Sequence, residues 1–407
     1  MSPSGPGNII LGLGGTIDYE IVWDEQLLQR LALEHGIRRD ECDSSLPISD
    51  ERSLVAVILG FALERHGGER FVRSPSVIEE FAALHEKTVT LGGTCVRAAL
   101  IMRALGVRST VHLVSIDDDF RRLYPRDCDY ISSAVHDGMP PHLIVQLPRH
   151  ARIGLADGEV CIEGADRLIF ANDPPHVRME LSPDLQESAR TAQWLLVSGF
   201  NVMTDLQLLQ HRLGELRSML AVRRATAVVM YEDAGFHSPH LQRTVRERIS
   251  PIVDVYSMNE DELQTHVGRD VDLLDPGSVA RAINDVRALI PHPTLVIHTR
   301  YWALASGPNA ERYSTGLRGG VSAATARYVH GDGVTAARVA AIDELEPPAE
   351  HRRIAESLPQ VVSEPVVCVP AYSVSVAHPT TIGLGDCFVG GFLAALATDA
   401  GQEMSPA

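Results

Sequence analysis

Cysteine is scarce in this sequence, and no two cysteines have metal-binding spacing. The six cysteines are scattered without a CxxC pair, at Cys42, Cys95, Cys128, Cys161, Cys368 and Cys387. Zinc sites and disulfide frameworks are recognised by closely spaced or regularly spaced cysteines, so neither is predicted here. Most of these residues are expected to be buried, reduced thiols.

Long hydrophobic runs are also missing. No stretch approaches the roughly 20 apolar residues of a membrane-spanning helix. The first residues, MSPSGPGNIILGLGG, lack the charged start of a signal peptide. We therefore expect a cytoplasmic protein with no membrane partner.

Positive charge is in deficit. The chain has 36 Lys and Arg against 53 Asp and Glu, which gives a formal net charge of -17. The densest basic group is Arg121, Arg122 and Arg126, and we expect it to be solvated. No stretch could neutralise a phosphate backbone, so no nucleic-acid partner is predicted. With 45% hydrophobic and 22% charged residues, the 407-residue chain is otherwise typical of a globular protein.

The first predicted strand ends in glycines. The segment NIILGLGG at 8–15 reads as a buried strand that enters a turn. A dinucleotide-binding G-x-G-x-x-G is excluded because Ile17 stands where the third glycine would be. The glycines would instead let a ligand approach, with Asp18 placed to bind the hydroxyls of a polyol. The alternative is that Asp18 is an ordinary turn residue.

A second glycine pair opens a predicted helix. In TVTLGGTCVRAALIMRALG, at 88–106, Gly92 and Gly93 precede a segment with helical spacing of apolar residues, and Gly106 ends it. Backbone amides at this start could contact a small ligand. The two glycines could equally mark a close packing point between strand and helix.

The pattern of the predicted strands changes twice along the chain. Between 111 and 173, short alternating segments bounded by turns indicate an antiparallel β-rich lid. From 188 onward, apolar runs alternate with helical stretches, which is typical of a doubly wound parallel sheet. Ligands bind at the carboxyl ends of such strands, where this chain has Asn201, Glu232, Asn259, Glu262, His298 and Thr299.

The segment SMNEDELQ places Asn259 and Glu262 three residues apart at a predicted helix start. An amide and a carboxylate at this spacing could hold a magnesium ion through its retained waters, since magnesium prefers oxygen ligands. The alternative is a capping box, with Asn259 as the N-cap and Glu262 at the third helical position.

The most informative stretch is HPTTIGLGDCFVGGFLAAL at 378–396. Gly383 and Gly385 give the backbone unusual freedom, and unpaired amides at a helix start form a cradle for a phosphate. Asp386 stands where a carboxylate could take a proton from an incoming hydroxyl while the amides stabilise a transferred phosphoryl group. The alternative is that Asp386 is only the N-cap of the helix.

Together these residues resemble the ADP-dependent sugar kinases, the glucokinases and phosphofructokinases of the ribokinase-like superfamily. The resemblance depends on TIGLGD at 381–386, MNEDEL at 258–263 and VIHT at 296–299, in the family's order. WLLVSGFNVM at 194–203 resembles the family's strand and Ser-Gly turn. ANDPPHVR at 171–178 resembles its hinge after the lid. The similarity spans nearly the whole chain.

The resemblance implies a role for each matching position. Asp386 would be the general base, with Gly383 and Gly385 in the anion hole formed by the amides of 383–386. Asn259, Glu262 and Glu232 would organise Mg²⁺. His298, Thr299, Thr381 and Arg178 would lie near the nucleotide, and Asp18, Gly92, Gly93, Thr94 and Asn172 near the acceptor.

Three departures from the family pattern are concentrated on the sugar side. The chain has LGGTID, with Gly15 and Thr16, where the family is usually Asn-rich before its Asp. Thr94 replaces an Asn after the glycine pair, and Met230 stands where a His two residues before Glu232 is typical. The resemblance therefore indicates the type of reaction more directly than it indicates the acceptor.

The predicted fold is α/β, a ribokinase-like doubly wound, mainly parallel sheet with helices on both faces and a smaller β-rich lid. We expect one catalytic unit over 1–407, with a discontinuous lid at about 16–45 and 110–180 and a nucleotide-binding body at about 46–109 and 181–407.

The predicted function is Mg²⁺-dependent transfer of a terminal phosphoryl group from a nucleotide, ADP by the resemblance, to a hydroxyl of a sugar, sugar phosphate or sugar-like acceptor. Two alternatives stay open. One is an ATP-dependent sugar or nucleoside kinase of the wider ribokinase-like group, and the other is a non-catalytic sugar or nucleotide sensor. The identity of the acceptor and the oligomeric state do not follow from the sequence.

Overall fold

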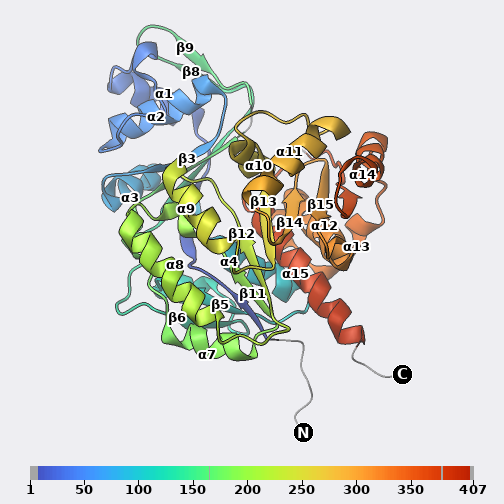
Figure 1. Ribbon diagram of the computed structural model, residues 1–407. Coiled ribbons are helices and arrows are strands. Elements are labelled where there is room, and N and C mark those ends of the chain that lie inside the picture. Colours follow the sequence, from blue (N-terminus) through green and yellow to red (C-terminus); the bar gives the residue numbers. More distant parts are fainter. Residues whose placement is uncertain (1–7, 165, 377–378, 404–407) are drawn as a thin grey trace.

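A nine-stranded sheet forms the centre of the larger part of the molecule (Figure 1). The computed structural model describes residues 8–164, 166–376 and 379–403. Neighbouring strands pair in parallel from β6 to β14, whereas β15 runs antiparallel to both β14 and β16. In spatial order the strands are β16 (Val366–Pro370), β15 (Trp302–Ser306), β14 (Thr294–His298), β13 (Val255–Asn259), β12 (Val228–Glu232), β11 (Trp194–Val197), β1 (Ile9–Leu11), β5 (Thr110–Leu113) and β6 (Asp129–Ser132).

Helices cover both faces of this sheet because successive strand residues point to opposite sides and both sides are apolar. Ile10, Leu195 and Val229 face one core, and Ile9, Leu196 and Val228 face the other. The first core is covered by α7 (Pro183–Thr191), α8 (Leu206–Leu220), α9 (Pro239–Ile249), α10 (Glu260–Val267), α11 (Pro276–Leu289) and α14 (Ala349–Val361). The second is covered by α4 (Thr94–Ala104), α5 (Asp118–Leu123), α12 (Ser314–His330) and α15 (Leu384–Glu403), with α13 (Ala336–Asp343) beside α12.

A second, five-stranded sheet belongs to a smaller lobe, in which α1 and α2 lie away from the large sheet (Figure 1). Its strand order is β3 (Gly68–Phe71), β10 (Asp166–Ala171), β7 (His142–Leu147), β2 (Thr16–Ile21) and β4 (Lys87–Gly92). One face packs in a separate core on α1 (Glu25–Glu34), α2 (Glu51–Glu64) and α3 (Pro75–Ala83), and the hairpin of β8 (Arg152–Gly154) and β9 (Glu159–Cys161) joins this core. We call this lobe the lid.

Local sequence signals explain where many helices begin. Aspartate side chains accept a hydrogen bond from the first-turn amides of α1, α2, α5, α8 and α11, which satisfies donors that the helix itself leaves unpaired. The remaining short helices are α6 (Pro174–Arg178), capped by Asp173, and the 3₁₀ helices η1 (Arg39–Glu41), η2 (Phe200–Val202), η3 (Ala310–Tyr313) and η4 (Gly331–Gly333).

The chain passes between body and lid beside the carboxyl end of the large sheet. β1 leads through Gly12–Gly15 into β2, and β4 returns through Gly93 into α4. A second excursion leaves after β6 and returns from β10 into α6. The lid is therefore attached next to the strand ends at which ligands bind in open parallel sheets.

The predicted doubly wound α/β fold with a smaller β-rich part is confirmed, but the expected boundaries of the lid are wrong. The segment 46–92, assigned to the body, contains α2, β3, α3 and β4, all of which belong to the lid. The strands β5 and β6, expected in an antiparallel lid, pair in parallel in the large sheet. Strand pairing is set by distant partners, and a short apolar run such as 111–113 fits either sheet.

Among the described residues, no helix has both the length and the apolar character needed to cross a bilayer.

Candidate active site

Asp386 lies in the first turn of α15 rather than before it. The helix begins at Leu384, and its first hydrogen bond joins the amide of Cys387 to the carbonyl of Gly383. The amides of 384–386 therefore precede the helical ladder, as the anion-cradle prediction requires. Asp386 is thus not the N-cap, and its side chain is 23% exposed.

The loop before α15 is held from both sides. Arg327 of α12 donates to the carbonyl of Ile382, and the amide of Thr380 donates to the carbonyl of Tyr328. From the lid, Arg167 donates to the carbonyl of Thr381 over 3.2 Å. Gly383 adopts a φ of 69°, a conformation that favours glycine, so the turn into the helix depends on this residue.

Arg97 of α4 connects Asp386 with the lid. Its Nε lies 3.9 Å from Asp386 Oδ2, and its Nη2 lies 3.0 Å from Asp18 Oδ2 and 3.4 Å from Glu20 Oε1. The Arg97 side chain is only 5% exposed. Burial opposes the charge of the guanidinium, but the surrounding carboxylates prevail and raise the pKa of Arg97. The predicted base and the predicted acceptor-binding aspartate are thereby held by one side chain.

The second glycine pair fits closely around Asp18. A Cβ on Gly92 would lie 2.2 Å from both Asp18 Oδ2 and Thr16 Oγ1, and Thr16 donates to Asp18 Oδ1 over 2.7 Å. Gly93, with φ at 84°, is the N-cap of α4, and Thr94 is the first residue of that helix. The predicted acceptor residues Asp18, Gly92 and Gly93 are therefore neighbours. The glycines also form the close packing point between strand and helix that the sequence left as an alternative.

Neighbouring strand ends supply a second group of predicted residues. Glu232 ends β12, Asn259 ends β13 and His298 ends β14, and Asn259 is directly opposite His298 in the sheet. His298 Nε2 lies 2.9 Å from Glu232 Oε1. The imidazole also stacks on Phe388 of α15, and a Cβ on Gly385 would lie 3.4 Å from His298 Cε1. His298 thus connects the strand ends with the start of α15.

Asn259 and Glu262 form the capping box that the sequence left as an alternative. Asn259 Oδ1 accepts from the amides of Asp261 and Glu262, and Glu262 Oε2 accepts from the amide of Asn259 over 2.8 Å. Glu262 is nevertheless electrostatically unusual. Burial and the neighbouring Asp233 carboxylate raise its pKa well above the ordinary value, with Glu232 adding to the effect.

These acidic residues fit a magnesium ion held through water. In the described residues, no group of three or more His, Cys, Asp or Glu side chains could hold a metal directly. The Glu232 Oε2 atom, however, is buried without a hydrogen-bond partner. A buried carboxylate oxygen without a partner is costly, and a cation or its bound water would relieve both this cost and the repulsion around Glu262.

Other predicted nucleotide and acceptor residues have structural contacts. The Thr299 hydroxyl accepts from the amides of Tyr301 and Trp302 and donates to the Trp302 carbonyl, which closes the β14–β15 turn. Arg178 pairs with exposed Glu180 over 3.9 Å. Asn172 donates to the carbonyl of Val72 within the lid. These side chains are not brought together with Asp386, and their roles in binding remain predictions.

Three buried groups at the site were missed by reasoning from the sequence. Arg97 was assigned only to a helix segment. Asp233 accepts from His266 and from the hydroxyls of Tyr231 and Tyr256 behind the strand ends. At the lid junction, Asp173 Oδ2 lies 2.7 Å from His176 Nδ1 and 3.2 Å from His142 Nε2. Tyr231 and His176 are neighbours in sequence of the aspartates they contact, but His266, Tyr256 and His142 are distant, so only an observed fold reveals the full clusters.

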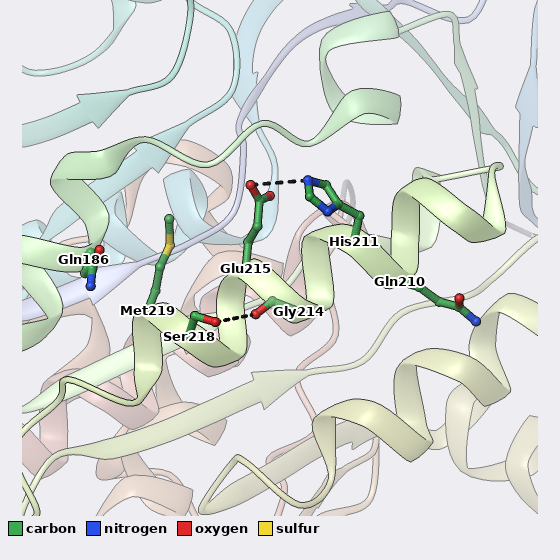
Figure 2. Close-up of a pocket in the computed structure, with 7 residues that line it drawn as sticks. All are labelled: Gln186, Gln210, His211, Gly214, Glu215, Ser218 and Met219. Atoms are coloured by element: carbon green, nitrogen blue, oxygen red, sulfur yellow. Dashed lines mark hydrogen bonds and ion pairs between the residues drawn. The ribbon is translucent and has the colours of Figure 1, made fainter.

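A surface groove lies elsewhere, against α7 and α8 (Figure 2). Its volume is about 550 Å³, and Gln186, Gln210, His211, Gly214, Glu215, Ser218 and Met219 line it. The contacts drawn in it, His211 with Glu215 and Ser218 with Gly214, are local to α8. Because α8 packs on the opposite side of the large sheet from α4 and α15, this groove is separate from the candidate site.

Residues 7–304 match the family model described as the ADP-specific Phosphofructokinase/Glucokinase conserved region. The chain belongs to this family. The match covers most of the chain and ends before α15, so the Asp386 loop lies outside it. No protein of curated function matches the sequence.

The fold of this family member agrees with solved structures at low sequence identity. A hypothetical ADP-dependent phosphofructokinase from Pyrococcus horikoshii OT3 is 16% identical, with a TM-score of 0.76, and the match covers 99% of this chain and 100% of that one. A phosphofructokinase from the same organism, in a structure with AMP, is also 16% identical, with a TM-score of 0.75 and the same coverage of both chains. An ADP-dependent kinase in complex with fructose-6-phosphate and ADPβS is 11% identical, with a TM-score of 0.75, and the match covers 96% of this chain and 93% of that one.

Family membership confirms the resemblance seen in the sequence and establishes the reaction class. This member of the ADP-specific phosphofructokinase/glucokinase family is a nucleotide-dependent sugar phosphotransferase, a kinase that phosphorylates a sugar hydroxyl. The similar structures support the same fold over nearly the full length of the chain.

Proposed function

We propose that this protein transfers the terminal phosphoryl group of ADP to a hydroxyl of a sugar, sugar phosphate or sugar-like acceptor in a Mg²⁺-dependent reaction. Asp386 acts as the general base, and the amides of 383–386 form the anion hole. ADP is favoured as donor by the family match, and by similarity to structures that contain AMP or ADPβS.

The observation that carries the proposal is the placement of Asp386. Its carboxylate is partly exposed in the first turn of α15, beside unpaired amides and 3.9 Å from the arginine that also holds Asp18. A base must lie within reach of the acceptor hydroxyl, and a developing phosphoryl charge needs preorganised donors. The candidate base and these donors lie on one turn of backbone, which supports the proposal.

Asp386 removes the proton of the acceptor hydroxyl as that oxygen bonds to phosphorus and the bond to the leaving phosphate oxygen breaks. The helix amides stabilise the oxygens of the transferred group, so catalysis rests on positioning and charge stabilisation. Asp18, with Gly92, Gly93 and Thr94 beside it, orients the acceptor through its hydroxyls. Asn172 remains an acceptor residue on the resemblance alone.

Glu232, Asn259 and Glu262 would hold Mg²⁺ through its waters. The bound ion would neutralise charge on the nucleotide phosphates. His298 orients Glu232 and borders the start of α15, so it lies between the metal residues and the anion hole. Thr381, whose carbonyl is held by Arg167, belongs to the loop around the phosphates. Thr299 and Arg178 are retained as nucleotide-side residues from the resemblance.

The test is turnover by wild type and by Asp386→Asn with a panel of ADP and ATP against neutral sugars and sugar phosphates, in the presence of magnesium. We expect turnover with ADP and a loss of roughly 10²–10⁴-fold in kcat for the variant, the range for a general base. Asp399→Asn removes an exposed carboxylate from the same helix and should keep full activity. Undiminished turnover by Asp386→Asn would remove this residue from the mechanism, and preference for ATP would overturn the donor assignment.

A further inference from the structure

The buried guanidinium of Arg97 contacts carboxylates that belong to different lobes. On one side it contacts Asp18 and Glu20 of β2 in the lid, and on the other it approaches Asp386 of α15 in the body. A buried arginine needs paired charges to offset its desolvation, but a single carboxylate would meet that need. The planar guanidinium instead contacts several carboxylates through different nitrogens and fixes their relative positions.

A glycine of the neighbouring backbone leaves room for the Arg97 side chain. A Cβ on Gly383 would lie 2.7 Å from Arg97 Cδ and 3.3 Å from its Nε, so the loop before α15, here called the anion loop (380–383), packs directly on the aliphatic part of the arginine side chain. At the start of α4, Gly93 packs closely on Gly15: a Cβ on Gly93 would lie 3.0 Å from the Cα of Gly15. The arginine, the loop before α15 and the chain entering the lid therefore form one contact.

We propose that Arg97 is a positioning residue for phosphoryl transfer, which holds the base Asp386 in register with Asp18, the carboxylate that orients the acceptor. This inference rests on the proposed function of the same site. Arg97 itself makes no bond to the reacting atoms. It aligns the acceptor hydroxyl with the base by fixing both carboxylates, and alignment errors of about 1 Å are enough to cost roughly 10²-fold in rate.

Arg97 supplies positive charge to this group of acids, and Arg327 of α12 is a second cation near Cys387. The lid contributes Asp18, which accepts from Thr16, and Glu20, which accepts from Thr90. Helix α15 contributes Asp386 and the thiol of Cys387, and α4 contributes the thiol of Cys95. Burial raises the pKa of both thiols to about 12, so the thiols carry no charge at neutral pH. Removal of the guanidinium would leave these carboxylates to repel one another and favour their protonated forms.

Arg97→Gln and Arg97→Lys separate position from charge. In Arg97→Gln we expect kcat to fall by about 100-fold and the acid limb of the kcat profile to move to higher pH by about one unit. In Arg97→Lys the charge remains but the planar guanidinium fork is lost, so the acid limb should stay in place while kcat falls by about tenfold. The KM for ADP should change little in both variants. Arg103→Gln is the matched control, since Arg103 lies on the same helix as Arg97 and its substitution breaks only an exposed ion pair with Asp127.

The outcomes are decisive when kcat is expressed per folded enzyme, with folding checked by thermal melting. A purely structural arginine would lower the melting temperature of Arg97→Gln and leave kcat and the pH profile at wild-type values, which would overturn the inference. If Arg97→Gln does not fold, Arg97→Lys decides, because wild-type kcat in that variant contradicts a positioning role. The proposed function fails separately, through absent wild-type turnover with every donor and acceptor or full activity of Asp386→Asn.

Discussion

His298 Nε2 lies 2.9 Å from Glu232 Oε1, and its ring stacks on Phe388 with the centroids 4.4 Å apart. One imidazole therefore joins the ends of two strands of the large sheet to the first turns of α15. The second carboxylate oxygen, Glu232 Oε2, is left buried without a partner. This arrangement gives the proposed magnesium site a direct test.

Glu232→Gln should weaken the response of the protein to magnesium. The amide cannot offer the anionic oxygen that a cation or its water would use, while its size leaves the contact with His298 in place. A ligand at 100 times its Kd stabilises the native state by about 2.7 kcal/mol, so magnesium added at fixed ADP should raise the melting temperature of wild type and do so less in the variant. Glu356→Gln, which changes an exposed acid on α14, is the control. An equal magnesium response in both variants would contradict the assignment.

Gly383→Ala should abolish most turnover. The residue has a φ of 69°, and a Cβ would lie 2.7 Å from Arg97 Cδ. The left-handed backbone costs a non-glycine residue about 1–2 kcal/mol, and the clash would in addition displace the anion loop. Turnover per folded enzyme is the measurement, with thermal melting alongside.

Gly106→Ala is the control for Gly383→Ala. Gly106 has a φ of 80° but open space where its Cβ would be, so it carries the backbone cost without the clash. We expect both alanine variants to lose stability and only Gly383→Ala to lose turnover. Similar activity losses in the two would show that strain alone, and not the contact with Arg97, controls the rate.

Gly92→Ala should act on the acceptor and not on the nucleotide. The added methyl group would meet Asp18 Oδ2 and Thr16 Oγ1 at 2.2 Å and push the carboxylate from its position. We expect the KM for the acceptor to rise about tenfold, with the KM for ADP unchanged, because the two substrates contact different parts of the site. Steady-state kinetics with each substrate varied in turn measure the effect. Gly214→Ala, in open space on α8, should leave both constants unchanged, whereas a raised KM for ADP in Gly92→Ala would place Gly92 on the nucleotide side.

His112 should make the protein less stable in acid. Burial lowers the pKa of His112 to about 4, and its Nε2 accepts a hydrogen bond from the amide of Ser182. The unfolded chain takes up a proton below about pH 6.5, whereas the folded chain does so only near 4, so lowering the pH through this window favours unfolding. At 1.36 kcal/mol per pH unit, His112 lowers the free energy of unfolding by about 3 kcal/mol between neutral pH and pH 4.

His112→Gln tests this because glutamine keeps an acceptor but does not titrate. Denaturant unfolding between pH 4 and pH 7 should show a flatter pH dependence of the unfolding free energy than in wild type. His211→Gln, on the surface of α8, should follow the wild-type curve. A wild-type slope in His112→Gln would show that other groups cause the acid sensitivity.

Local patterns were sufficient for the strands and helices of the body from about residue 194 onward and for the positions of several candidate residues on them. The glycine pair before α4, the capping spacing at Asn259 and Glu262, and the apolar runs at 194–200, 225–233 and 294–299 each specify their own structure, because caps and strand periodicity act over a few residues. The residues that end β12, β13 and β14 were also found, since parallel strands bring their carboxyl ends to one edge.

The boundaries of the lid could not be read in the same way. Strands β3 and β4 entered the lid although their segment was assigned to the body, and β5 entered the large sheet. An edge or inner position in a sheet depends on the partner strand, which is distant in the chain. The local sequence also left open whether Asp386 is the N-cap of α15, and the structure excludes that alternative because the helix begins at Leu384, two residues before Asp386.

By itself, the sequence determined the class of fold, the family, and the positions of the carboxylates and glycines that contact neighbouring residues within a turn or a strand end. Only the tertiary structure decided which of them meet. Arg97 on an isolated helix segment is indistinguishable from a solvated arginine, and its contacts with Asp18 and Asp386 span 79 and 289 positions of the chain. Such contacts form because burial makes a lone charge costly, and that cost arises only once the lid and body have folded around it.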